Sequence, residues 1–142
     1  AVSALETEGL AVAWAEMQAL ADWVVDSDRV NDPTLYDAWY DTPRGRWIGK
    51  TEYRLAEREL ALRPDARVLD VGCGTGWFTR RLARRGNMEV TAIDIDSEWL
   101  EYARSRDCHS RYIRADALAL PFADNSFDAV LSIAALCFTS SW

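Results

Sequence analysis

The chain has 142 residues, of which 49% are hydrophobic and 27% charged, a composition that is typical of a globular protein and argues against a disordered one. Its formal net charge of −7 argues against nucleic acid or an anionic membrane surface as the main partner. The cysteines Cys73, Cys108 and Cys137 show neither a metal-ligand spacing nor a disulfide framework, which favours a reducing, cytoplasmic location.

Residues 1–30 are predicted to form an N-terminal extension with one amphipathic helix over residues 3–25. Apolar side chains recur there at helical spacing, which is typical of core packing or of a dimer contact. Acidic and amide residues interrupt the apolar stretch, so we do not expect it to cross a membrane. The apolar stripe consists of Leu10, Trp14, Met17, Ala21 and Val24.

The next segment is predicted to be helical as well. Asp32 and Pro33 form the pattern of a helix N-cap followed by proline at the first helical position, which predicts a short helix that reaches Tyr40. A turn at 42–45 then leads to a longer helix over 46–62, where apolar residues again recur at helical spacing.

Strand and helix patterns alternate from residue 65 onward, which predicts right-handed crossovers and a parallel sheet. Strands are predicted at 66–71, 89–95, 111–115 and 127–137, and helices at about 76–85 and 98–106. Arginines near the end of the first of these helices are interpreted as a solvated face that complements the helix dipole; they are Arg80, Arg81, Arg84 and Arg85. The chain is thus divided into an extension (1–30), a helical lid segment (31–64) and an α/β core (65–142).

The stretch from Ala66 to Gly76 predicts a buried strand that runs directly into a glycine-rich turn. Gly72, Gly74 and Gly76 stand at alternate positions, where they allow positive backbone dihedrals and let a ligand approach the main chain closely. Asp70 interrupts the apolar strand, and a buried carboxylate is costly unless it has a partner. The sequence therefore predicts a ligand site over this turn.

The glycine pattern alone does not decide which ligand, if any, binds over the turn. The dinucleotide-binding pattern G-x-G-x-x-G, counted from Gly72, would require a third glycine where this chain has Trp77. A nicotinamide-dependent oxidoreductase would have to tolerate that tryptophan. A P-loop is excluded because no Gly-Lys-Ser/Thr follows. An ordinary strand–turn–helix without a ligand is also compatible with the glycines alone.

Carboxylates follow the next two predicted strands. A nucleoside over the turn needs its ribose hydroxyls held, and Asp94, at the end of the neighbouring strand, can accept hydrogen bonds from both. Alternatively, Asp94 is an acidic residue at the start of a loop, with no role in ligand binding. Asp96 fits the N-cap of the following helix better, however, which leaves Asp94 available for the ligand. Asp116, after the third strand, could accept a hydrogen bond from an adenine amino group or could be a plain turn aspartate.

Five short motifs occur in the order and spacing of one family: Val68-Leu69-Asp70-Val71-Gly72-Cys73-Gly74-Thr75-Gly76, Ile93-Asp94, Asp116-Ala117, Leu120-Pro121-Phe122 and Ser126-Phe127-Asp128-Ala129-Val130. With them the chain resembles the class I S-adenosylmethionine-dependent methyltransferases of the type 11 group, similar to the ubiquinone and menaquinone biosynthesis methyltransferases. The segment from Tyr36 to Tyr40 resembles the helical lid that precedes the first motif in this group.

This resemblance implies an α/β fold, with the N-terminal half of a Rossmann-like parallel sheet in strand order 3-2-1-4, flanking helices and preceding N-terminal helices. It implies S-adenosylmethionine as methyl donor, S-adenosylhomocysteine as product and a small molecule as methyl acceptor, with no metal. The implied cofactor-binding residues are Tyr40, Asp70, Gly72, Cys73, Gly74, Thr75, Gly76, Asp94, Ile95, Asp116, Ala117 and Ser132.

Individual roles within this set also follow from the resemblance. The turn with Thr75 would pack on the methionine part and the sulfonium, and Asp70 would orient the turn and reach the amino group through water. Asp94 would bind the ribose, and the pair Asp116-Ala117 would hold the adenine. Ser132, on the predicted fourth strand, would lie near the methionine end and the methyl acceptor.

The predicted sheet differs from that of the family, which has seven strands where this chain has four. We therefore interpret the sequence as a fragment, or as a protein whose sheet a second chain completes, for example in a homodimer. The apolar run from Val130 to Leu136 would then form an uncovered edge. Two functions are expected: a small-molecule methyltransferase, or a non-catalytic cofactor-binding or assembly module. No catalytic residue is assigned, because the single histidine, His109, is predicted to lie on a surface loop.

Overall fold

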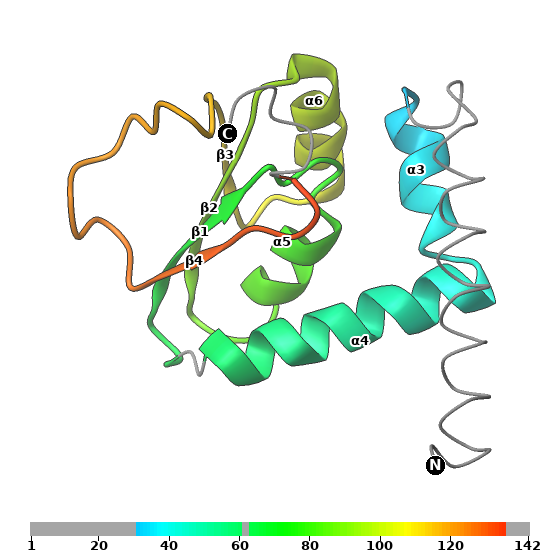
Figure 1. Cartoon of the computed structure of the whole chain (residues 1–142), viewed down its shortest axis with the longest axis horizontal. Helices are drawn as coiled ribbons and strands as arrows, with labels where there is room; N and C mark the ends of the chain where they lie inside the picture. The colour runs from blue at the N-terminus through cyan, green and yellow to red at the C-terminus, as the bar shows by residue number, and fades with distance from the viewer. Residues whose placement is uncertain (1–30, 61–62, 136–142) are drawn as a thin grey trace, which may run out of the picture.

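A computed structural model describes residues 31–60 and 63–135, and the helix predicted over 3–25 lies outside these ranges. The described chain forms a four-stranded parallel sheet in the order β3-β2-β1-β4 with helices packed beside it (Figure 1). The predicted α/β architecture and strand order are therefore confirmed. The elements are α3 (Pro33–Trp39), α4 (Pro43–Leu60), β1 (Arg67–Val71), α5 (Trp77–Ala83), β2 (Glu89–Asp94), α6 (Ser97–Arg106), β3 (Arg111–Arg114) and β4 (Ala129–Leu131).

The central strand β1 is buried on both of its faces. It pairs in parallel with β2 on one side and with β4 on the other. Val68 packs in the same core cluster as Leu82 of α5, whereas Leu69 packs with Ile93 in a separate cluster. Successive side chains of a strand point to opposite faces, so two covered faces account for the almost continuous apolar run of β1.

Helix α4 connects α3 to the core and packs against α5. The hydroxyl of Tyr53 donates to the backbone oxygen of Arg81 at 3.4 Å, and Glu57 forms an ion pair with Arg85 at 3.0 Å. In Figure 1, α4 runs from the end of the sheet toward α3, which stands apart from the strands. Because α4 packs on α5, α3 is held next to the helical layer.

Helices α3 and α4 begin at side-chain caps. The carboxylate of Asp32 accepts hydrogen bonds from the backbone of Thr34 at 2.7 Å and of Leu35 at 3.3 Å, which confirms the predicted cap of α3. The prediction of a turn over 42–45 is wrong, because α4 already begins at Pro43. The hydroxyl oxygen of Thr42 accepts from the backbone of Gly45 at 3.0 Å, so this segment forms the capped first turn of α4.

Strand β4 is shorter than the sequence predicts. It begins at Ala129 and ends at Leu131, so Ser132 lies beyond the strand rather than on it. The backbone of Ala134 has a positive φ of 54°, which is incompatible with continued extended structure. Within the described residues the apolar edge is therefore limited to three residues, of which Val130 is 54% exposed. The rest of the predicted run, from residue 136, lies outside the described residues.

We expect Gly49→Ala to lower the free energy of unfolding, although alanine normally stabilises a helix. An added Cβ would lie 2.6 Å from a ring carbon of Trp77 and 2.8 Å from one of Tyr40. Overpacking of this kind costs about 1–3 kcal/mol and the gain in helix propensity is about 1 kcal/mol, so the expected net loss is up to about 2 kcal/mol. Denaturant titration measures the change, with the exposed Lys50→Ala as a near-neutral control. A Gly49→Ala variant more stable than the parent would contradict this packing.

Candidate functional site

The glycine turn joins β1 to α5 in the conformation that the sequence predicts. Gly72, Gly74 and Gly76 all have positive φ angles, of 72°, 52° and 74°. The backbone N–H groups of Gly72 and Cys73 both donate to the carbonyl of Ile93 at 2.9 Å. The end of β2 therefore fixes the start of the turn and leaves its middle at the carboxyl edge of the sheet.

Asp94, at the end of β2, lies directly against this turn. One carboxylate oxygen accepts from the backbone N–H of Gly74 at 2.8 Å, and the other accepts from that of Asp96 at 3.1 Å. Asp96 in turn caps α6 by accepting from Glu98 at 2.9 Å, as the sequence predicts. Both carboxylate oxygens of Asp94 thus already accept hydrogen bonds from the backbone. Because an ionised carboxylate can accept about four hydrogen bonds, it can still accept some from a ligand.

Asp70 is a buried carboxylate behind the turn, and its partner is Thr79 of α5. The Thr79 hydroxyl donates to Asp70 at 2.5 Å, which meets the requirement that the sequence imposes on this position. Burial raises the pKa of Asp70 to about 6; the Thr79 hydrogen bond opposes this shift and the nearby charge of Asp94 adds to it. The side chain of Asp70, near the C-terminal end of β1, therefore titrates closer to neutral pH than an ordinary aspartate does.

The ends of β2 and β3 supply the other predicted contacts for a nucleoside. Ile95 follows β2 and is 62% exposed. The Asp116 carboxylate accepts from the backbone of Leu118 at 2.8 Å, which is a turn contact, while its neighbour Ala117 packs against the cluster around Ile93. Because β2 and β3 are parallel neighbours, these residues lie at the same edge of the sheet as the glycine turn.

Other predicted site residues lie deeper or further out. Thr75 is only 1% exposed, and its hydroxyl donates to Asp37 at 2.8 Å. Tyr40 is buried and stacks on Trp77 with ring centroids 4.3 Å apart. Cys73 is half-buried, and burial raises the pKa of its thiol well above the usual range. Ser132 is exposed beyond β4. A ligand role for these four residues remains a prediction.

The interpretation of the four arginines as a solvated face is wrong for Arg80 and Arg81, whereas Arg84 and Arg85 are exposed. Arg80 is buried and pairs with Asp37 of α3 at 2.8 Å. Arg81 lies over the ring of Trp77, 3.2 Å from its centroid, and Arg85 pairs with α4. The exposed Arg84, unlike the exposed Arg85, has no ion pair among the described residues. Partners 43 residues apart, as Asp37 and Arg80 are, leave no local signal in the sequence.

A surface depression of about 250 Å³ lies away from the glycine turn. It is lined by Arg84 and by residues 104–109, which lead into the amino end of β3, so it is at the opposite edge of the sheet. His109 lies there with two-thirds of its side chain exposed, as the sequence predicts. Among residues 31–60 and 63–135, no cluster of histidine, cysteine and carboxylate side chains is arranged for a metal ion, and no helix is long and apolar enough to cross a membrane.

Comparison with known families supports the family resemblance that the sequence motifs indicate. The profile of a methyltransferase domain matches residues 68–142, which include the glycine turn and all four strands except the first residue of β1. The malonyl-[acyl-carrier protein] O-methyltransferase of Erwinia pyrifoliae is 48% identical over 75 residues, which are 53% of this chain and 28% of that protein. The chain thus spans less than a third of the length of this curated relative.

Two solved structures share the fold. The [4+2]-cyclase SpnF matches with a TM-score of 0.52 and 32% identity, over 56% of this chain and 32% of that one. Coclaurine N-methyltransferase, solved with N-methylheliamine and S-adenosylhomocysteine, matches with a TM-score of 0.52 and 25% identity, over 58% of this chain and 26% of that one. The same half-sheet therefore occurs in proteins with different reactions.

We expect Asp70→Asn to change how stability depends on pH. With a pKa of about 6 in the folded chain and roughly 3.9 when unfolded, Asp70 binds more protons in the folded state between these pH values. Its contribution to the free energy of unfolding therefore falls as pH rises from 4 to 6, by roughly 3 kcal/mol. Asparagine does not titrate, so the free energy of unfolding of the variant does not contain this pH-dependent decrease. The difference in stability, variant minus parent, should therefore rise from pH 4 to 6 and stay constant at higher pH.

Denaturant titrations at several pH values measure this difference. Asp65→Asn removes the same charge from an exposed position and is the matched control. If the Asp70→Asn and parent profiles ran parallel from pH 4 to 7, Asp70 would not carry the raised pKa.

Proposed function

The chain belongs to the methyltransferase-domain family, and on that premise we propose that it binds S-adenosylmethionine over the glycine turn and takes part in methyl transfer to a small molecule. The observation that carries the proposal is the contact of Asp94 with the backbone of Gly74 at 2.8 Å, between two strand ends. It places a carboxylate beside a turn of three glycines with positive φ. A ribose that approaches this turn would meet an acceptor for both of its hydroxyls.

The residues at the strand ends fit a nucleoside that carries a charged sulfur group. Ile95 offers an exposed apolar surface next to Asp94, and Asp116 and Ala117 follow the neighbouring strand. We propose that these three residues hold the adenine, and that Asp70 favours a cation at the turn when it is ionised. Since Thr75 already donates its hydroxyl to Asp37, it would contact the ligand through its backbone.

When bound, S-adenosylmethionine would supply a methyl group on a sulfonium: the acceptor atom would form a bond to the methyl carbon as the carbon–sulfur bond breaks, and the thioether of S-adenosylhomocysteine would be the leaving group. The chain's own residues contribute mainly position and alignment to such a reaction. The turn and Asp94 would fix the ribose end, and Ser132, beyond β4, would lie near the acceptor. We propose a small-molecule acceptor, a cytoplasmic location, and a sheet completed beyond β4 either within a longer chain or by a second chain such as an identical subunit.

A second candidate is binding of the cofactor without methyl transfer. It is favoured by the solved cyclase, which shares this half-sheet at 32% identity but has a different reaction in its name. A nicotinamide-dependent reaction is disfavoured, because Trp77, at the position of the third glycine, is buried against Tyr40 rather than open to a pyrophosphate.

Calorimetry identifies the cofactor, and a turnover assay then separates the two functions. We expect S-adenosylhomocysteine and S-adenosylmethionine to bind and NAD⁺ not to bind. Turnover of phenolic or quinone acceptors, followed by release of S-adenosylhomocysteine, distinguishes the methyltransferase from the binding module. Binding of NAD⁺ in preference to both sulfur compounds would refute the proposed cofactor.

We expect Asp94→Asn to weaken S-adenosylhomocysteine binding by roughly 10- to 100-fold, because hydrogen bonds to a charged acceptor contribute about 1.5–3 kcal/mol. Asp96→Asn is the matched control, since asparagine caps a helix as well as aspartate does and the charge change is the same. Both affinities are measured by calorimetry on variants whose circular dichroism matches the parent. Equal affinity of the Asp94→Asn variant and the parent would remove Asp94 from the site.

A further inference from the structure

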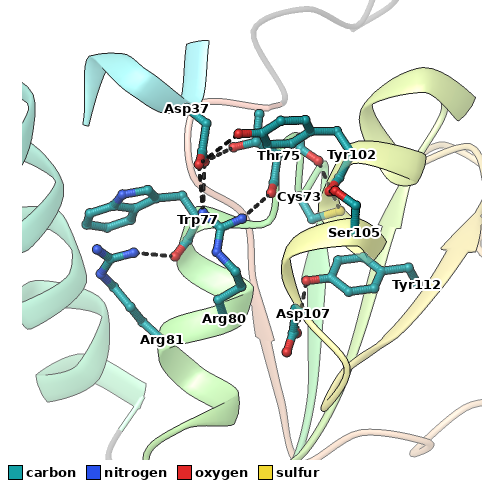
Figure 2. A network of polar contacts seen from close by, with 11 residues as sticks. Asp37, Cys73, Thr75, Trp77, Arg80, Arg81, Tyr102, Ser105, Asp107 and Tyr112 are labelled. Carbon is teal, nitrogen blue, oxygen red and sulfur yellow. Dashed lines mark hydrogen bonds and ion pairs between the residues drawn. The ribbon is translucent and has the colours of Figure 1, made fainter. Parts of the chain in front are cut away.

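Three side chains from different elements donate to the buried carboxylate of Asp37 (Figure 2). We call this group the Asp37 junction; it consists of Asp37, Thr75, Arg80 and Tyr102. Asp37 of α3 accepts from Thr75 in the turn at 2.8 Å. It also accepts from Arg80 of α5 at 2.8 and 3.0 Å and from the Tyr102 hydroxyl of α6 at 3.3 Å. The junction therefore connects α3 to the glycine turn and to both helices that follow it.

The ion pair in this junction is buried. Asp37 is 8% exposed and Arg80 is 7% exposed. A buried pair is tolerated only with good geometry and with further hydrogen bonds to the remaining donors and acceptors. Arg80 meets this condition, since its second terminal nitrogen donates to the backbone oxygen of Thr75 at 2.6 Å. Both the side chain and the main chain of Thr75 are therefore held by the pair.

Thr75 stands between two glycines of the turn, so its position decides the path of the backbone there. An aromatic contact also reaches the same turn. Tyr36 of α3 packs edge-on against Trp99 with ring centroids 4.9 Å apart, and a Cβ on Gly74 would lie 3.4 Å from the Trp99 ring. Helix α3 thus contacts the surroundings of the turn through a polar and an apolar route.

We propose that Asp37 and Arg80 are positioning residues, which couple the docking of α3 to cofactor binding by fixing Thr75. This inference rests on the proposed function, because it assumes that the ligand binds over the turn. Coupling between two sites is reciprocal. If docked α3 improves the turn for the cofactor, bound cofactor must stabilise docked α3 by the same factor. Loss of a pair that serves only general stability would leave the ligand affinity of the folded chain unchanged.

The test combines calorimetry with hydrogen exchange of the α3 amides, with and without S-adenosylhomocysteine. In the parent chain, saturating ligand should slow exchange in α3. Asp37→Asn should weaken ligand binding roughly tenfold, within the usual range of coupling, and should reduce the ligand-dependent protection of α3 by the same factor. Asp41→Asn, with the same charge change at an exposed position just after α3, should leave both quantities unchanged.

Thr75→Val provides a second test in case Asp37→Asn fails to fold. It is isosteric and removes the hydrogen bond from Thr75 to Asp37 while leaving the buried ion pair intact. It should also reduce both the affinity and the protection. Ligand binding by the parent without added protection of α3, or a folded Asp37→Asn variant with unchanged affinity, would overturn the coupling alone. Failure of the parent to bind S-adenosylhomocysteine would overturn the proposed function and the coupling together.

Discussion

The hydrogen bond from the backbone of Gly74 to Asp94 connects the two parts on which the site depends. A turn with three positive φ angles exposes backbone N–H groups that would otherwise need water or a ligand. Here the carbonyl of Ile93 and the carboxylate of Asp94 satisfy three of them, and both come from the end of β2. The parallel pairing of β1 with β2 is thus what allows the turn to exist, and it places an acidic group where a ribose would bind.

Local signals made most of this fold predictable. Asp32 and Asp96 cap helices where their spacing predicts caps, because an N-cap depends on atoms only two or three residues away. The three glycines adopt the positive φ angles that their pattern requires. The first three parallel strands follow from short apolar runs separated by helical periods, and the fourth follows a loop. The strand order implied by the family resemblance could therefore be stated before any coordinates.

Features with distant partners could not be predicted in the same way. Arg80 lies in the first turns of a helix, where solvated arginines are also common. No residue near it in the sequence indicates that Asp37 is its partner. The run after Val130 looks extended, yet β4 ends at Leu131, because tertiary contacts rather than β-propensity decide where pairing stops. The beginning of α4 was missed for a different reason: the Thr-Pro-Arg-Gly pattern fits a turn and a helix start equally well.

The buried ion pair also has a consequence for how the sequence can change over evolutionary time. Replacement of either Asp37 or Arg80 alone leaves an uncompensated charge in the interior, which is among the most destabilising substitutions known. Joint replacement by neutral side chains of similar volume avoids that penalty. The two positions should therefore covary in an alignment of homologues, and a mutational path from one pair to the other passes through a less stable intermediate.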